Sequence, residues 1–230
     1  MNKKNYSGLI IALLFSTLSS YAQDWGQLNY FKAKNDSIMQ LTDSNSVVFM
    51  GNSITQGWIS MRPEFFSENG FVNRGIGGQT TPQMLLRFRQ DVIDLNPKLV
   101  VILAGINDIA ENTGPISIQD MAKNLESMVQ LALANDIIPV LCSVLPANSF
   151  PWRLRINPTE RVIELNDLLK QMAESYQVPY VDYYTPMVDD QRGLKTEWGY
   201  DPVHPNEAGY RVMEPLLMST LSPLLAKSNL

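Results

Sequence analysis

Residues 47–55 read VVFMGNSIT, and apolar runs like the one that opens this stretch recur along the chain. Its first four residues are apolar and rich in β-branched and aromatic side chains, which is typical of a buried β-strand. The residues that follow are small and form a turn, with the hydroxyl of Ser53 at its tip. The stretch therefore predicts a strand that presents a serine at its carboxyl end.

Three further apolar runs lie at residues 99–104, 137–144 and 178–183. Helix-like stretches separate the four runs, and this alternation predicts a parallel sheet. Residues 116–134 place apolar side chains at a three-and-four spacing, which marks a helix with one buried face, and residues 161–173 repeat the pattern.

A last helix is expected to begin after Asn206, because asparagine is a good N-cap. The apolar side chains of Val212, Leu216 and Leu217 are expected to point into the core. Pro215 would kink this helix, because proline cannot donate a backbone hydrogen bond.

Three of the predicted loops reach the same edge of the sheet, where open parallel sheets bind their ligands. Ser53 follows one strand, and residues 105–108 (Gly-Ile-Asn-Asp) follow another. Residues 73–80 follow the short run at residues 71–72 and precede a helix that Thr81 could cap. We expect a functional site where these loops meet.

Residues 1–22 have the features of a cleaved secretory signal: Lys3 and Lys4, an apolar stretch, and small residues before Ala22. A transmembrane anchor is the alternative, but the apolar run is shorter than the roughly 20 residues that span a bilayer. We expect a protein secreted or periplasmic after cleavage near Ala22, with no stable membrane anchor. Residues 23–230 are then enough for one domain with its own core.

The charge and the rare residues of the chain exclude several classes of function. The formal net charge is −5, and it becomes −7 without the two lysines of the signal, so a nucleic-acid partner is not expected. The one histidine and one cysteine, His204 and Cys142, cannot make the usual zinc sites, so no metal is expected. Cys142 lies in an apolar run, as a buried structural cysteine would.

The single histidine lies in a segment that also carries an acid, Asp201, three residues before it. Acyl transfer needs a nucleophile, a base within hydrogen-bond reach and a group that orients the base. Ser53 is the candidate nucleophile and His204 the candidate base. Asp201 could accept from the second imidazole nitrogen, which fixes the tautomer and stabilises the imidazolium.

An acyl-transfer site also needs hydrogen-bond donors for the developing oxyanion. The backbone N–H of Ser53, the backbone N–H of Gly78 and the side-chain amide of Asn107 are the candidates. Taken alone, Asn107 could equally be a turn residue. Residues 75–78 could be a flexible turn, and they do not complete a dinucleotide-binding fingerprint, because Thr80 stands where its third glycine belongs.

Taken together and in this order, Ser53, Gly78, Asn107 and His204 resemble the signature of the SGNH hydrolases, also called GDSL-type esterases and lipases. Asp201 matches the acid of the family's Asp-x-x-His element. Two neighbours of the serine depart from the commonest pattern, since Asn52 stands where aspartate is usual and isoleucine replaces leucine at position 54.

This resemblance implies a flavodoxin-like three-layer α/β/α sandwich with a central parallel sheet over residues 23–230. It also implies hydrolysis of acyl esters or thioesters of lipids, sugars and small molecules, without a cofactor.

The substrate is less clearly indicated than the reaction. Trp58, Trp152, Trp198 and Met61 could contact a sugar, and Arg74, Arg62 or Arg153 could hold an anionic group, but packing and solvated surface are the alternatives. We expect a small-molecule or glycan ester with a short acyl group, with Trp58, Arg74 and Trp198 as candidate binding residues. A lysophospholipase or thioesterase, an acyltransferase and a non-catalytic glycan-binding module are the other possibilities.

Overall fold

The computed structural model of the chain describes residues 24–39 and 47–226, and the predicted signal segment, residues 1–22, lies outside them. Within these residues, five parallel strands form a sheet in the order β2-β1-β3-β4-β5. This is the strand order of flavodoxin-like folds, so the predicted central parallel sheet is confirmed. The strands are β1 (Val47–Gly51), β2 (Val72–Gly75), β3 (Leu99–Leu103), β4 (Ile138–Cys142) and β5 (Tyr180–Val181).

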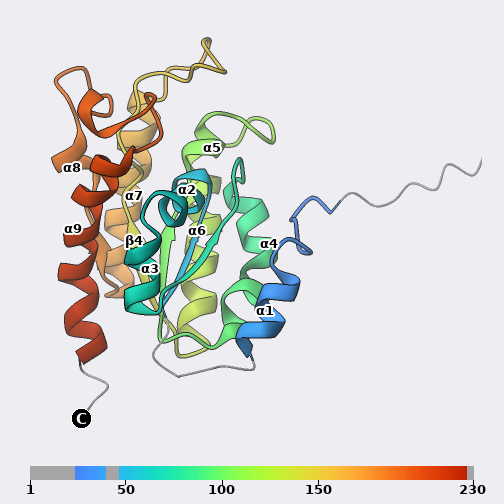
Figure 1. Cartoon of the computed structure of the whole chain (residues 1–230). Coiled ribbons are helices and arrows are strands. Elements are labelled where there is room, and N and C mark those ends of the chain that lie inside the picture. Colours follow the sequence, from blue (N-terminus) through green and yellow to red (C-terminus); the bar gives the residue numbers. More distant parts are fainter. Residues whose placement is uncertain (1–23, 40–46, 227–230) are drawn as a thin grey trace, which may run out of the picture.

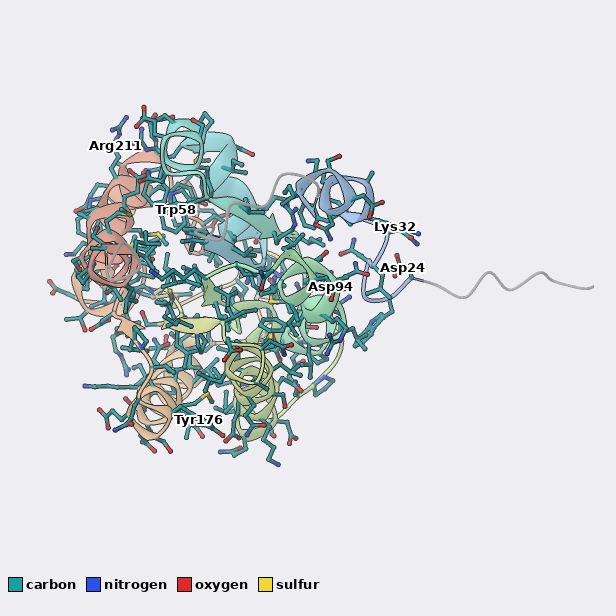
Figure 2. All side chains as sticks on the ribbon, turned by 90° about the horizontal axis from the view of Figure 1, so that it is seen from below. Asp24, Lys32, Trp58, Asp94, Tyr176 and Arg211 are labelled. Carbon is teal, nitrogen blue, oxygen red and sulfur yellow. The ribbon has the colours of Figure 1, made fainter. Side chains whose placement is uncertain are left out.

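Helices connect the strands and cover both faces of the sheet (Figures 1 and 2). The helices are α1 (Lys32–Met39), α2 (Ser53–Met61), α3 (Pro63–Asn69), α4 (Thr81–Asp91), α5 (Ile106–Ile109), α6 (Ile118–Leu133), α7 (Thr159–Tyr176), α8 (Tyr184–Met187) and α9 (Glu207–Ala226), with 3-10 turns η1 (Ile93–Leu95) and η2 (Thr196–Trp198). Helices α4, α6 and α7 form one outer layer, and α2, α3 and α9 form the other. None of the described helices has the length and apolar character needed to cross a membrane.

The two central strands explain why the sheet could be predicted. Every residue of β1 and of β3 is buried, because helices cover both faces. Such strands read as continuous apolar runs rather than alternating ones, which is how they appear in the sequence.

Strand β5 is shorter than the predicted run at residues 178–183. It pairs with β4 only at Tyr180 and Val181. The backbone N–H groups of Tyr183 and Tyr184 instead donate to the Ser143 hydroxyl, at 2.8 and 2.9 Å. The hydroxyl of Ser143 thus replaces the backbone carbonyls of β4 as the acceptor, and the chain turns into α8.

Helix α9 begins at Glu207, directly after the predicted cap, and Pro215 lies inside it. Its buried face consists of Gly209, Tyr210, Met213, Leu217 and Leu221. The prediction for Leu217 is confirmed, whereas Val212 and Leu216 are only half-buried. The spacing of apolar residues in this helix therefore predicted a wider buried face than the structure shows.

Candidate active site

The residues around Ser53 form a tight turn between β1 and α2. Ser53 is the first residue of α2, and the side-chain oxygen of the buried Asn52 accepts from the backbone N–H of Ile54, at 3.0 Å. Asparagine therefore caps the helix here, in the place where aspartate is usual. A Cβ atom on Gly51 would lie 2.0 Å from Thr55 Oγ1, so only glycine allows the strand to approach α2 this closely.

The structure brings the three candidate triad residues into one hydrogen-bonded line. Ser53 Oγ lies 2.9 Å from His204 Nε2, and His204 Nδ1 lies 2.8 Å from Asp201 Oδ2. The other carboxylate oxygen of Asp201 accepts from the backbone N–H groups of Val203 and His204, at 2.7 and 2.8 Å. The loop before α9 thus presents the base and the acid as one unit.

The hydrogen bonds of Asp201 also determine its charge. Partial burial raises the pKa of this carboxyl, but the donated hydrogen bonds from His204 and Val203 outweigh burial, so the net pKa lies below its usual value. Asp201 is therefore ionised at neutral pH, as an acceptor for the imidazole must be.

Each of the three candidate oxyanion donors has a hydrogen available for a further acceptor. The N–H of Ser53 is at the start of a helix, where it has no partner within the helix, and nothing among the described residues accepts from the N–H of Gly78. Gly78 has a φ of +78°, a conformation that favours glycine. Asn107 Nδ2 donates one hydrogen to Gln79 O, at 3.0 Å, which leaves its second hydrogen for another acceptor.

Comparison with known proteins identifies the family of this chain. The model of the GDSL-like lipase/acylhydrolase family matches residues 49–212 of this chain. The chain belongs to this family. It is therefore a member of a family of ester hydrolases, as its sequence resemblance implies.

Several relatives show how far the similarity extends. The crystal structure of a GDSL-like lipase from Bacteroides thetaiotaomicron is 42% identical, with a TM-score of 0.83, covering 89% of this chain and 99% of that one. The uncharacterized lipoprotein YqeF of Bacillus subtilis is 38% identical over 55% of this chain, a match that spans only 59% of that protein. The human platelet-activating factor acetylhydrolase IB subunit alpha2 is 26% identical over 83% of each chain.

Residues 75–79, here called the glycine loop, are bonded to a buried arginine that was not expected from the sequence. Arg87 donates from Nε to Gln79 Oε1, at 2.6 Å, and from Nη1 to Asp91 Oδ2, at 3.0 Å. Both members of this ion pair have fully buried side chains. A signal for it was present in α4, where Arg87 and Asp91 fall on the same helix face as the apolar Met84 and Phe88.

Asp108 is a second buried acid at the site. Its carboxylate accepts from the backbone N–H of Thr81, at 3.0 Å, and from the Thr81 hydroxyl, at 2.6 Å. Burial raises its pKa to about 6, although the bonds from Thr81 oppose the rise. Asp108 thereby joins helix α5, which carries Asn107, to the first residue of α4.

Two of the candidate substrate-binding residues, Trp58 and Arg74, are buried. Trp58 is 1% exposed, and its ring stacks on Phe65 and Tyr210 at centroid distances of 5.4 and 5.3 Å. Arg74 is also buried, where its Nε donates to Asn35 Oδ1 at 2.8 Å. Trp58 therefore packs in the core, and Arg74 is a buried group bonded to Asn35 rather than an exposed one beside His204.

Trp198 is half-buried, and Lys195 Nζ lies 4.4 Å from the centre of its ring. One face of this ring is thus occupied by a cation. Its role in binding stays a prediction.

Two exposed aromatic rings do lie beside the imidazole. Tyr200 stacks on the His204 ring at 5.4 Å, with an interplanar angle of 8°, and the Trp152 ring lies 6.0 Å from it. Tyr200 is 61% exposed and Trp152 44% exposed. Trp152 is among the aromatic residues that the sequence suggested for sugar contact, whereas Tyr200 is not.

Among residues 24–39 and 47–226, no group of three acidic, histidine or cysteine side chains could hold a metal ion. Cys142 is buried in β4, and burial raises the pKa of its thiol to about 12.

Proposed function

We propose that this chain is an exported serine esterase that removes short acyl groups, such as acetyl, from carbohydrates. The observation that carries the proposal is the line of hydrogen bonds from Ser53 Oγ through His204 to Asp201, with distances of 2.9 and 2.8 Å. A nucleophile, a base and an orienting acid in this arrangement are what acyl transfer requires.

In the proposed cycle, Ser53 Oγ attacks the ester carbonyl carbon while its proton moves to His204 Nε2. The charge on the carbonyl oxygen is stabilised by the N–H groups of Ser53 and Gly78 and by the second Nδ2 hydrogen of Asn107. Collapse of the tetrahedral intermediate breaks the bond to the alcohol, which takes the proton from His204. A water then gives its proton to His204 and attacks the acyl-serine, which releases the acid and restores Ser53.

The surroundings of His204 support a carbohydrate as the alcohol. Because His204 protonates the leaving oxygen, the leaving group lies beside the imidazole. The exposed rings of Trp152 and Tyr200 are at that position. Aromatic faces of this kind pack against the apolar C–H faces of sugar rings. The relative named as an acetylhydrolase supports a short acyl group.

Export is part of the proposal and rests on residues 1–22. Their charge pattern and the small residues before Ala22 fit signal cleavage. The similarity to a lipoprotein supports a place outside the cytoplasm, while the absence of a cysteine next to the cleavage site favours a protein without a lipid anchor. N-terminal sequencing of the exported protein is expected to begin near Gln23, and retention of residues 1–22 would contradict export by cleavage.

The catalytic test uses Ser53→Ala and His204→Ala. Each is expected to abolish hydrolysis of 4-nitrophenyl acetate, and a fluorophosphonate probe is expected to label the wild type but not Ser53→Ala. Ser60→Ala is the matched control, because Ser60 is an exposed serine on the same helix. Full activity of Ser53→Ala or His204→Ala would overturn the triad.

The substrate test uses a series of acyl esters from acetate to palmitate together with acetylated sugars. Preference for acetylated sugars supports the proposal. Preference for long acyl chains or thioesters would replace it by a lysophospholipase or thioesterase. Binding of glycans without turnover of any ester would indicate a glycan-binding module.

A further inference from the structure

A polar cavity of about 310 Å³ lies beside the glycine loop, on residues that the proposed triad does not use. It is bounded by the N-terminal segment at Asp24, Trp25 and Gln27, by Gly78, and by Asn112 after α5. The cavity adjoins the reaction site through Gly77, which also lines it. Gly77 lies so near the nucleophile that a Cβ atom added to it would be 3.9 Å from Ser53 Cβ. A ligand bound there therefore lies next to the nucleophile.

The N-terminal segment is held in place by the side-chain amides of Gln79 and Gln83. Gln79, which is 1% exposed, donates to Gly26 O and to Gln27 Oε1, at 3.1 and 2.9 Å. Gln83 Nε2 donates to Trp25 O, at 2.7 Å. Gln79 also accepts a hydrogen bond from Arg87. The residue that holds one wall of the cavity is therefore itself fixed by the buried arginine.

Several polar groups around the cavity have donors or acceptors that make no hydrogen bond within the described residues. Asn112 uses its Nδ2 on Gly78 O, at 3.2 Å, and Gln27 uses its Oε1 on Gln79. Within the part of the chain that the structure describes, Asn112 Oδ1, Gln27 Nε2 and the indole N–H of Trp25 have no partner. An acceptor and two donors thus remain for a ligand.

These groups suit a neutral ligand with many hydroxyls. A hydroxyl both donates and accepts, so it can satisfy an amide oxygen and an amide N–H together. The exposed indole of Trp25 supplies an apolar face for a ring. No lysine or arginine is among the described residues that line the cavity, and the carboxylate of Asp24 disfavours an anionic ligand.

We infer that this cavity is a second sugar subsite, which binds a ring of a neutral oligosaccharide next to the ring that carries the ester. The inference rests on the proposed function. The ester lies at Ser53, its leaving sugar contacts Trp152 and Tyr200 beside His204, and a further sugar ring reaches past Gly78 into the cavity. Oligosaccharide esters are then better substrates than acetates of simple alcohols.

The test compares kcat/KM for an acetylated neutral tetrasaccharide with kcat/KM for ethyl acetate, which cannot reach the cavity. Trp25→Ala and Asn112→Ala are each expected to lower the ratio of these two values about 10-fold, the effect of losing one stacking or hydrogen-bond contact. Leu28→Ala is the control, because Leu28 is exposed on the same segment and lies outside the cavity lining. It is expected to leave the ratio at the wild-type value.

A ratio that stays at the wild-type value in both Trp25→Ala and Asn112→Ala would overturn the subsite. A direct measurement adds to this: the unacetylated tetrasaccharide is expected to shift the indole resonance of Trp25 in Ser53→Ala, and an unmoved resonance would contradict the inference. Failure of the proposed function looks different: the wild type would then hydrolyse neither ester, or would prefer the long acyl chains or thioesters of the substrate series.

Discussion

Arg87 donates from Nη2 to the carbonyl oxygen of Gly51, at 3.1 Å, two residues before Ser53. The same guanidinium holds Gln79, whose own carbonyl accepts from the Asn107 side chain at 3.0 Å. One buried cation thus connects the serine turn with the loop that positions two of the proposed oxyanion donors. Its charge is balanced by the buried Asp91.

Arg87→Lys is expected to lower kcat about 10- to 100-fold while KM changes little. A lysine keeps the charge near Asp91 but cannot reach Gly51, Gln79 and Asp91 together, so the oxyanion donors lose their fixed positions. Steady-state kinetics on 4-nitrophenyl acetate measures this. A raised KM with wild-type kcat would show that Arg87 affects binding instead.

Arg89→Lys is the control for this substitution, because Arg89 lies on the same helix with an exposed side chain. Arg87→Met separates support of the site from stability. It leaves the buried carboxylate of Asp91 without its cationic partner, although Asn35 still donates to it, and this is expected to cost about 3–5 kcal/mol of unfolding free energy in urea titrations.

Asp201→Asn is expected to lower kcat by about 10⁴, the loss known for a triad aspartate in an unrelated fold. The two backbone N–H groups of Val203 and His204 require an oxygen at the position of Oδ1. The new amide nitrogen then faces His204 Nδ1 and donates to it, which leaves the proton on Nε2, where it blocks uptake from Ser53. Asp190→Asn, an exposed aspartate, is the control, and wild-type turnover in Asp201→Asn would remove Asp201 from the mechanism.

The residues of the proposed triad could be singled out in the sequence because their signals are local or unique. The strand at residues 47–51 is buried on both faces, so its apolar run is continuous, and the serine lies two residues after its end. The chain has one histidine, and its aspartate is three residues away on the same loop. Such placements need no knowledge of the tertiary structure.

The supports of the site could not be predicted in the same way. The contact between Arg87 and Gly51 depends on how α4 lies against β1, and no spacing in the sequence encodes that distance. Trp58 illustrates the opposite case, since its position four residues after Ile54 on the buried face of α2 indicated packing. Trp58 is close to Ser53 in the sequence, but helical periodicity places its ring on the buried face of α2.

Asp108 is expected to make the stability of the protein depend on pH. Its pKa is raised to about 6 in the folded chain, from an ordinary value of 3.8. Between these values the folded state binds a proton that the unfolded state has lost, so this contribution to stability is fully present below pH 3.8 and is lost as the pH rises through 6. The shift corresponds to about 3 kcal/mol.

Asp108→Asn removes this titration and provides the comparison. The unfolding free energy of the wild type minus that of the variant, measured by urea titration from pH 4 to pH 7, is expected to fall as the pH rises. A difference that stays constant, or one that grows with pH, would contradict a raised pKa for Asp108.

Trp58 and Trp152 are a matched pair that separates packing from substrate contact. Trp58→Ala empties a fully buried site and is expected to cost about 3–5 kcal/mol of stability. Trp152→Ala removes an exposed ring and is expected to leave the melting temperature near that of the wild type. It is expected to raise KM for an acetylated sugar about 10-fold, because stacking beside His204 is lost, with a smaller change for ethyl acetate. Equal changes in KM for both esters would show that Trp152 does not contact the sugar.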